Sequence, residues 1–308
     1  MAPVIFLIVV LFILIGKAAD IVITGVRGLA EKLRVNLFLA GMVLGLFTSL
    51  PEITIGINAL AERIPAISFG NLIGGTLVLF GPILGLSLIL NRRVATDGEW
   101  SSILPITLYL MLPLLYGIDG VVSKLDGSIL IFGYLVVLYY SYRSHRYIQP
   151  QRIGRRYDVS AELLTIIIGM VGVFVCATAI IHYTQLVLDA YQLPAFLVGL
   201  IAFSFGTNLP ELTVTIRSWR RHIRDLSISN LIGSALTNGL TIGAFALMLP
   251  IVVTINYSYL ALFVGNTVLL GALSLFYRSR RAFSRAEGVV LIVLYSLTVL
   301  SVAVFAIH

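Results

Sequence analysis

The sequence predicts an all-α polytopic membrane protein whose ten transmembrane helices form two inverted five-helix repeats. Three observations lead to this fold class. The first is composition, because 59% of the 308 residues are hydrophobic and only 11% are charged, whereas about 25% of an average soluble domain is charged. The second is an alternation of basic and nearly neutral loops between ten apolar stretches. The third is a pair of motifs that recurs in the two halves of the chain.

So few charged residues exclude several classes of protein. They cannot cover a soluble surface, which argues against a soluble enzyme, a disordered chain and a nucleic-acid-binding protein. Cys176 is the one cysteine, so an internal disulfide framework and a cysteine-rich metal site are excluded. The N-terminal stretch lacks both a basic region and a cleavage site, and it is therefore predicted to be a retained first span.

The apolar stretches define the spans in order, because a bilayer core of about 30 Å needs about 20 apolar residues per helix. The fourth stretch ends loosely around Asp119, and the fifth is short. The second and seventh contain a proline followed by a glutamate, and the third and eighth are rich in small residues. The predicted spans are 3–26, 36–60, 66–90, 103–121, 128–141, 161–188, 195–216, 226–249, 257–277 and 288–306.

The basic residues indicate which loops share a side of the membrane. Of the 21 Lys and Arg residues, 18 lie in the loops that follow the odd-numbered spans. The even-numbered loops carry only Arg63 and Lys124, and Lys17 lies within the first span. Since basic loops stay in the cytoplasm, both termini are predicted to lie outside. The net charge of +7 is therefore an orientation signal, and no nucleic-acid partner is expected.

Two sequence blocks recur with a single offset of 159 residues. Residues 48–52 (TSLPE) match residues 207–211 (TNLPE), and residues 71–74 (NLIG) match residues 230–233 (NLIG). Because an odd number of spans separates the copies, the halves cross the membrane in opposite directions, as in many secondary transporters. The predicted repeats are 1–150, with spans one to five, and 151–308, with spans six to ten, within one integral membrane domain.

Glu52 and Glu211 lie inside apolar spans, whereas most other acidic residues lie in or near loops. A carboxylate in hydrocarbon costs about 2.5–3.5 kcal/mol even on a lenient scale, so each must face a cavity, a cation or a proton. The alternative is a protonated glutamate bonded to a neighbouring helix. The repeat-related positions of the two residues favour the cation.

The surroundings of both glutamates are rich in oxygen atoms. Pro51 and Pro210 interrupt helical hydrogen bonding, and such broken helices occur only where they are buried or line a cavity. Carboxylate, carbonyl and hydroxyl oxygens together suit hard cations such as Ca²⁺ and Na⁺. For each hydroxyl the alternative is a bond back to its own helix. The neutral oxygen ligands available near the glutamates are the carbonyls of Gly45 and Ser204 and the side chains of Thr48, Ser49, Thr207 and Asn208.

The second block adds two polar side chains in the eighth span. Ser234 and Asn238 lie one helical turn apart and therefore share a face. The glycines nearby, such as Gly70 and Gly74, are predicted to serve close helix packing.

These residues carry a family resemblance. Residues 206–212 (GTNLPEL) and 229–234 (SNLIGS), with their first-half copies 47–53 (FTSLPEI) and 70–75 (GNLIGG), form a double motif over both halves. This motif resembles that of the prokaryotic-type sodium/calcium exchanger family of the cation/calcium antiporter superfamily. The resemblance covers nearly the whole chain.

The resemblance implies an antiporter that binds cations between spans two, three, seven and eight. Glu52 and Glu211 match the two glutamates that the transported ions share. Gly45 and Ser204 match backbone-carbonyl ligands, and Ser234 matches a hydroxyl ligand. The remaining matches are Thr48, Ser49, Thr207 and Asn208 as flanking ligands and Asn238 at a position that is often acidic or an amide.

The chain departs from the family pattern at Gly75 and Leu79, where the family usually has polar side chains. These positions pair with Ser234 and Asn238 through the repeat offset. Phe47 also replaces the glycine of the first motif. The site therefore has two formal charges, which neutralise one Ca²⁺ or two Na⁺, so the counter-ion is left open between Na⁺ and H⁺.

The expected function is Na⁺/Ca²⁺ exchange by alternating access. One alternative is exchange of H⁺ or another cation through a degenerate Na⁺ site, and another is a Ca²⁺-binding membrane module that does not transport. No protease, esterase or P-loop motif is present, so no enzymatic activity is expected. No cofactor is expected beyond the transported ions. The expected setting is the plasma (inner) membrane, with lipid as a partner, and a monomer is compatible with the chain.

Overall fold

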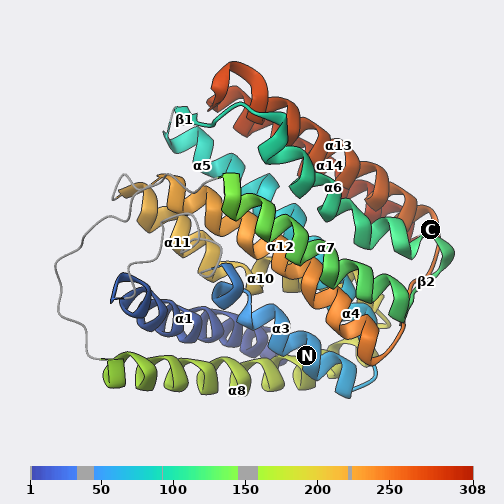
Figure 1. Cartoon of the computed structure of the whole chain (residues 1–308). Coiled ribbons are helices and arrows are strands. Elements are labelled where there is room, and N and C mark those ends of the chain that lie inside the picture. Colours follow the sequence, from blue (N-terminus) through green and yellow to red (C-terminus); the bar gives the residue numbers. More distant parts are fainter. Residues whose placement is uncertain (1, 33–44, 92, 145–158, 221–223, 308) are drawn as a thin grey trace.

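The computed structural model describes residues 2–32, 45–91, 93–144, 159–220 and 224–307, which form a bundle of helices (Figure 1). Four short strands lie in connections: β1 (Arg93–Ala95), β2 (Val121–Val122), β3 (Ile251–Val252) and β4 (Ala282–Ser284). The helices are α1 (Ala2–Lys32), α3 (Leu50–Ala61), α4 (Pro65–Val78), η1 (Leu79–Ile83), α5 (Leu84–Asn91), α6 (Trp100–Tyr116), η2 (Gly117–Asp119), α7 (Lys124–Ser144), α8 (Val159–Tyr191), α9 (Ala195–Val198), η3 (Gly199–Phe203), α10 (Ser204–Thr207), α11 (Leu209–Arg220), α12 (Arg224–Met248), α13 (Tyr257–Arg278), η4 (Ser279–Arg281) and α14 (Arg285–Ile307).

The helices confirm the predicted class of an all-α polytopic membrane protein. Within the described ranges, nine helical segments are long and apolar enough to cross a bilayer, and they match nine of the ten predicted spans. The predicted second span, 36–60, lies partly outside the described residues, and its described part includes the apolar helix α3. The fifth span is longer than predicted, because α7 runs from Lys124 to Ser144.

The pairing of elements links the two halves of the chain. β1 pairs antiparallel with β4, and β2 pairs antiparallel with β3. In the same way α12 packs on α7 and α5 packs on α14. The repeat offset carries each pair approximately onto the other, as expected of inverted halves around a twofold axis. The two strand pairs lie toward opposite ends of the bundle (Figure 1). The boundary between residues 150 and 151 lies outside the described residues and stays a prediction.

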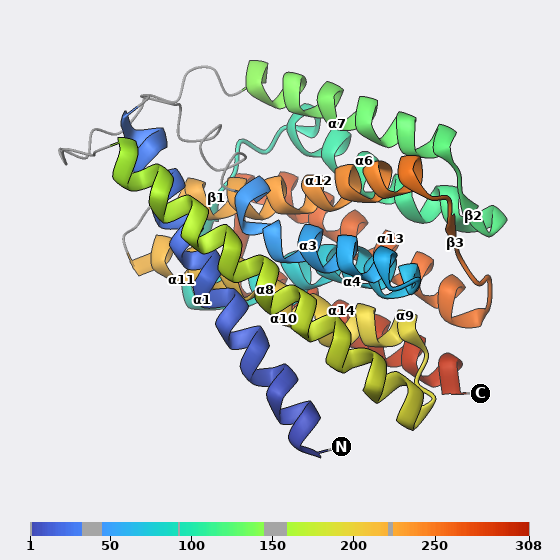
Figure 2. The same cartoon turned by 90° about the horizontal axis from the view of Figure 1, so that it is seen from below.

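The helices differ in what surrounds them. Residues 67–78 of α4 and 229–239 of α12 are buried without interruption. In contrast, α1 and α8 lie side by side on the outside of the bundle (Figure 2). Phe6, Ile167 and Leu300, on α1, α8 and α14, expose large apolar side chains, as suits contact with lipid chains. The polar groups of the central helices are therefore kept away from hydrocarbon.

Two π-helical turns interrupt spans that the sequence predicts as continuous helices. η1 follows α4 and contains Pro82, and η3 separates α9 from α10. A proline inside a helix lacks the N–H donor that regular helical bonding needs, and a π-turn absorbs such an irregularity. Such turns are frequent at functional sites, and η3 leads directly into the segment that carries the TNLPE motif of the second half.

Candidate cation-binding site

Two helices break at repeat-related residues in the middle of the bundle. Ser49, which precedes α3, has φ −80° and ψ 6°. Asn208, between α10 and α11, has φ −85° and ψ 12°. Two residues further on, Pro51 and Pro210 lack the N–H group that would continue the preceding helix. The same short motif therefore gives the same backbone turn in both halves.

Glu52 and Glu211 lie in the first turn of the helices that follow these breaks, α3 and α11. Their side chains are 1% and 0% exposed, and the two carboxylates interact electrostatically. The Oε2 atom of each is buried and accepts no hydrogen bond from the described residues. Interacting carboxylates away from water need a positive charge, supplied by a cation or a proton.

Glu211 is surrounded by hydroxyl groups. The Oγ of Ser234 lies 3.1 Å from Oε1 of Glu211 and 2.9 Å from the hydroxyl oxygen of Thr48. The carbonyl oxygen of Gly45 accepts hydrogen bonds from Thr48 Oγ1 at 3.0 Å and from Ser49 Oγ at 2.9 Å. It also lies 3.3 Å from Ser234 Oγ. We call these five residues the hydroxyl side of the site.

Glu52 contacts a hydroxyl group, and mainly amide groups lie behind that hydroxyl. The Thr207 hydroxyl interacts with the Glu52 carboxylate and donates to Oδ1 of Asn71 at 3.1 Å. Nδ2 of Asn208 donates to the carbonyl oxygen of Ser204 at 2.8 Å, which leaves Oδ1 of Asn208 buried without a donor among the described residues. We call Glu52, Asn71, Ser204, Thr207 and Asn208 the amide side of the site.

Asn238 completes the amide side from α12. A Cβ atom built on Gly75 would lie 2.9 Å from Nδ2 of Asn238 and 3.2 Å from Nδ2 of Asn208. The two amides therefore lie over the glycine. Both polar atoms of the Asn238 side chain are buried without a hydrogen-bond partner in the described structure. Buried polar atoms of this kind call for a bound ion or water.

The structure brings together all ten residues that the sequence analysis selects. The hydroxyls of Ser49 and Ser204 bond only to carbonyls of their own helical segments within the described ranges, as the alternative interpretation expects. Thr48 and Thr207 make such bonds and also reach another helix. The ten buried residues are Gly45, Thr48, Ser49, Glu52, Ser204, Thr207, Asn208, Glu211, Ser234 and Asn238.

The sequence analysis omits two buried amides next to the site. Asn71 accepts the hydrogen bond from Thr207, and its Nδ2 has no partner in the described part of the chain. Asn230, its repeat mate, has both amide atoms buried and unpartnered among these residues. A sequence signal for both exists, because the two asparagines open the second repeated block.

The donor set suits a hard cation as cargo. Within the described ranges, no group of three or more His, Cys, Asp and Glu side chains lies together. The site instead combines two carboxylates with neutral hydroxyl, amide and carbonyl oxygens, which are the ligands of Ca²⁺ and related ions.

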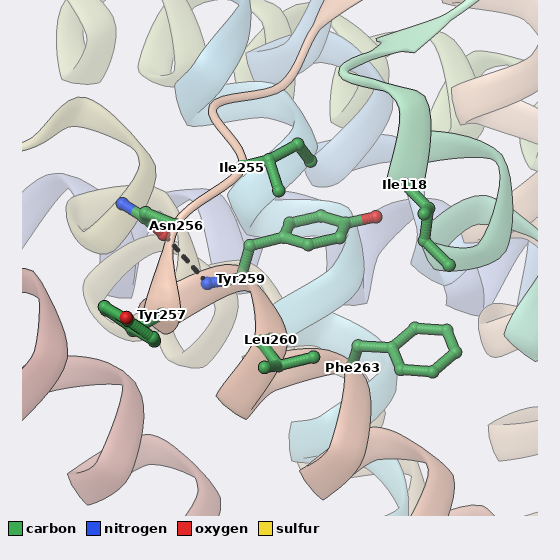
Figure 3. A pocket seen from close by; sticks show the side chains of 7 residues that line it. All are labelled: Ile118, Ile255, Asn256, Tyr257, Tyr259, Leu260 and Phe263. Carbon is green, nitrogen blue, oxygen red and sulfur yellow. Dashed lines mark hydrogen bonds between the residues drawn. The ribbon is translucent and has the colours of Figure 1, made fainter.

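A separate cavity of about 520 Å³ lies at the start of α13 and beside η2 (Figure 3). Its lining is apolar and aromatic, with Tyr257, Leu260 and Phe263 among the side chains. Oδ1 of Asn256 accepts a hydrogen bond from the Tyr259 backbone at 2.9 Å and so caps α13. Among the described residues, no carboxylate and none of the ten selected residues lines this cavity, so it is not the cation site.

The fold and the paired buried carboxylates are typical of one class, the multi-pass membrane transporters of cations. The profile of the family described as "Sodium/calcium exchanger protein" matches residues 3–143 and 161–304. The chain therefore belongs to the sodium/calcium exchanger family.

Individual relatives agree with this assignment. The chain is 29% identical over 243 residues to the uncharacterized membrane protein MJ0091 of Methanocaldococcus jannaschii, covering 77% of this chain and 80% of that protein. It is 22% identical to the sodium/calcium exchanger MaX1 of Methanosarcina acetivorans, covering 94% and 96%. A structure of the sodium-calcium exchanger NCX_Mj soaked with 100 mM Na⁺ and 10 mM Sr²⁺ superposes with a TM-score of 0.70 at 26% identity, covering 96% of this chain and 98% of that one.

Proposed function

We propose that this protein exchanges Na⁺ for Ca²⁺ across the membrane by alternating access. One observation carries the proposal: Glu52 and Glu211 interact at the buried breaks of two opposed helices, each with an oxygen that accepts no hydrogen bond among the described residues. Two carboxylates balance one Ca²⁺. The Oδ1 atoms of Asn208 and Asn238, also unpartnered within the described ranges, supply further neutral ligands.

Exchange follows from competition for these oxygens. Ca²⁺ and Na⁺ both prefer hard oxygen ligands, so binding of one ion at the carboxylates displaces the other. A site without a cation leaves two interacting carboxylates buried, which is unfavourable. The protein therefore changes its accessible side with a cation bound, which links the two fluxes.

The moving element in this proposal is the pair α1 and α8. These long helices pack on each other at small residues. A Cβ atom on Gly169 would lie 2.9 Å from the carbonyl oxygen of Ala18, and one on Gly25 would lie 2.8 Å from that of Glu162. α1 also contacts the second broken helix, since Gly16 packs on Leu209. A sliding of this pair against the rest of the bundle would alternately cover each end of the site.

The setting belongs to the same proposal. The positive-inside rule supports an orientation with both termini outside, and we propose a plasma membrane as the setting, with the lipid bilayer around a protein that works as a monomer. The protein acts as a transporter without enzymatic activity and without a cofactor other than its transported ions. In this proposal the protein binds and releases Ca²⁺ and a monovalent cation and does not change them chemically.

A cation/proton exchanger is the second candidate. It is favoured by Gly75 and Leu79, which provide no side-chain oxygen where their repeat mates are Ser234 and Asn238. A proton needs only a carboxylate, so loss of these ligands affects Na⁺ more than H⁺. Uptake driven by an imposed Na⁺ gradient, compared with uptake driven by a pH gradient, separates the two exchangers.

The main test is ⁴⁵Ca²⁺ flux into proteoliposomes that contain the full chain. We expect wild-type protein to take up Ca²⁺ into Na⁺-loaded vesicles, driven by the outward Na⁺ gradient. We expect Glu52→Gln and Glu211→Gln to abolish this uptake. Glu62→Gln is the matched control, because Glu62 is an exposed carboxylate at the end of the same helix as Glu52. Unchanged uptake in both site variants would falsify the proposed site. Ca²⁺ binding without any flux would instead favour a non-transporting module.

A further inference from the structure

Two cavities adjoin at the start of α13. One is the apolar cavity of about 520 Å³ between α13 and η2. The other, which we call the serine cavity because Ser258 lines it, has a volume of about 330 Å³ and lies beside α4, α9 and β3. Asn256 and Tyr259 line both cavities. Each volume lies in the range of ligand pockets, about 300–1,000 Å³, and the shared residues make the two spaces neighbours.

The apolar cavity continues the outer apolar surface of the bundle. Ile118 extends from η2 toward Phe263 of α13 (Figure 3), and both line the cavity. Leu260, also in the lining, is exposed, as are Val264 and Val268, one and two turns further along α13. Residues four positions apart share a helix face. The cavity is therefore open to the same face of α13 that contacts lipid chains.

Both cavities lie where membrane spans begin or end. The apolar helices that cross the bilayer include Tyr257–Arg278, Trp100–Asp119 and Arg285–Ala306, and Ala306 lines the serine cavity. The Tyr257 ring lies with its centroid 6.0 Å from that of Phe305. Tyrosine is enriched at the depth where the hydrocarbon meets the polar headgroups. A lipid at this depth places its chains beside α13 and its polar part beyond the helix end.

The serine cavity contains a buried polar group that calls for a ligand. Ser258 is 3% exposed, and its hydroxyl oxygen has no hydrogen-bond partner within the described ranges. The residue stands in the first turn of α13, next to the N-cap Asn256, which already bonds to the backbone N–H of Tyr259. A buried hydroxyl of this kind needs a partner from a bound molecule or water.

The occupant of this place has to be largely apolar. Among the residues that the structure describes, no charged side chain lines either cavity. An ion or a small charged solute would therefore find no counter-charge, and burial without one is costly. A molecule with a hydrocarbon chain and an oxygen acceptor at one end matches both cavities together.

We propose that the two cavities form one binding site for a membrane phospholipid. One hydrocarbon chain fills the apolar cavity between η2 and α13, and an oxygen near the glycerol accepts a hydrogen bond from the Ser258 hydroxyl. The lipid is held by apolar burial and by one polar contact, without a salt bridge. This site is separate from the cation site and does not depend on which ions the protein exchanges.

The test is native mass spectrometry of the purified full chain in detergent, titrated with phosphatidylcholine. We expect one lipid to bind wild-type protein saturably. Leu260→Trp fills the apolar cavity and should lower the lipid affinity on the order of 100-fold, because several CH₂ groups lose their buried place. Leu275→Trp is the matched control. Leu275 lies on the same helix with a similar exposure, 60% against 57%, and lines neither cavity.

A second pair of variants tests the polar contact. Ser258→Ala should lower the lipid affinity about fivefold, the size expected for one lost hydrogen bond. Ser274→Ala, at a buried serine of the same helix whose hydroxyl already has partners, should leave it unchanged. If Leu260→Trp does not fold, Ile118→Trp fills the apolar cavity from η2 instead.

Three results would overturn the inference. They are the absence of saturable lipid binding by wild-type protein, an unchanged affinity after the cavity is filled, and equally tight binding of glycerophosphocholine, which has the polar part of the lipid without its chains. None of these measurements uses Ca²⁺ flux, so their failure leaves the proposed exchange activity as it stands. Failure of exchange in proteoliposomes would likewise leave the lipid site unaffected.

Discussion

The hydroxyl side and the amide side of the site share a backbone and differ in chemistry. Ser49 and Asn208 adopt nearly the same φ and ψ, and each side chain bonds to the carbonyl four residues before it. Yet Ser49 is a hydroxyl and Asn208 an amide. The comparison shows that an inverted repeat determines where polar side chains of the site lie, while single substitutions determine which chemical groups these side chains carry.

The difference between the two sides arises from the neighbouring helices. α12 offers Ser234, whose hydroxyl is shared among Thr48, Glu211 and the carbonyl of Gly45. α4 offers Gly75 and, one turn earlier, Asn71. A cation bound at the centre, as we propose, would meet hydroxyl groups on the side of Glu211 and amide groups on the side of Glu52, so the two glutamates are not expected to be equivalent.

The largest expected effect tests this inequivalence. Glu211→Gln should lower Ca²⁺ affinity on the order of 100-fold, because a buried charge with its hydrogen-bonded shell is lost. Glu52→Gln should lower it less, because the hydroxyl side and its charge remain. The measurement is ⁴⁵Ca²⁺ binding to each purified variant, with Glu62→Gln as the control. Equal losses would show that the two sides bind the cation equally.

The second-largest expected effect concerns the helix breaks, which the two sides of the site share. Pro51→Ala and Pro210→Ala each restore a backbone N–H and remove part of the about 3 kcal/mol by which proline disfavours a continuous helix. Each variant should lower the exchange rate roughly 20-fold in proteoliposomes, since the carbonyls of Phe47 and Gly206, four residues before the two prolines, then enter helical bonds and the break is lost. Pro105→Ala, at a proline within α6 outside the breaks, is the control. A loss confined to one of the two variants would contradict a shared role of the breaks.

A smaller expected effect, on Ca²⁺ binding, differs between the hydroxyl side and the amide side. Thr48→Val removes the hydroxyl that joins Ser234 and should weaken Ca²⁺ binding about tenfold, the size expected for a contact within a charged network. Thr207→Val removes a hydroxyl that interacts with the Glu52 carboxylate and bonds to Asn71 but joins no second hydroxyl of the site. It should therefore weaken Ca²⁺ binding less, about threefold. Valine keeps the shape of threonine, so packing is nearly constant. The reverse order of the two losses would assign the cation to the amide side.

The smallest expected effect concerns a buried hydroxyl that lies outside the cation site. The hydroxyl of Ser274 bonds to Thr107 at 3.2 Å and to the carbonyl oxygen of Leu270, outside both sides. Ser274→Ala should cost about 1 kcal/mol of stability, visible as a lower melting temperature in detergent. Ca²⁺ affinity should be unchanged. A matching fall in affinity would mean that the binding site extends into the contact between α6 and α13.

Much of this molecule follows from local sequence. Length and hydropathy predict the spans because a bilayer demands apolar helices. The proline after each break predicts an interrupted helix because it lacks an N–H. The offset of 159 residues relates Glu52 to Glu211, and equivalent positions of inverted halves meet near the middle of the membrane. The prediction misses the π-turns, since η1 and η3 depend on packing around otherwise helical segments. It also misses Asn71, because its partner Thr207 is 136 residues away in the chain.

The membrane class, the inverted repeat and the ten selected residues all follow from the amino-acid sequence. Apolar length, proline and a buried carboxylate each have physical consequences that do not depend on distant neighbours. The division of these residues between a hydroxyl side and an amide side comes from the fold. It depends on which helices cross: Ser234 meets Thr48 across the bundle, and Asn238 covers Gly75. Contacts between residues far apart in the chain are set by the packing of whole helices, and no local pattern specifies them.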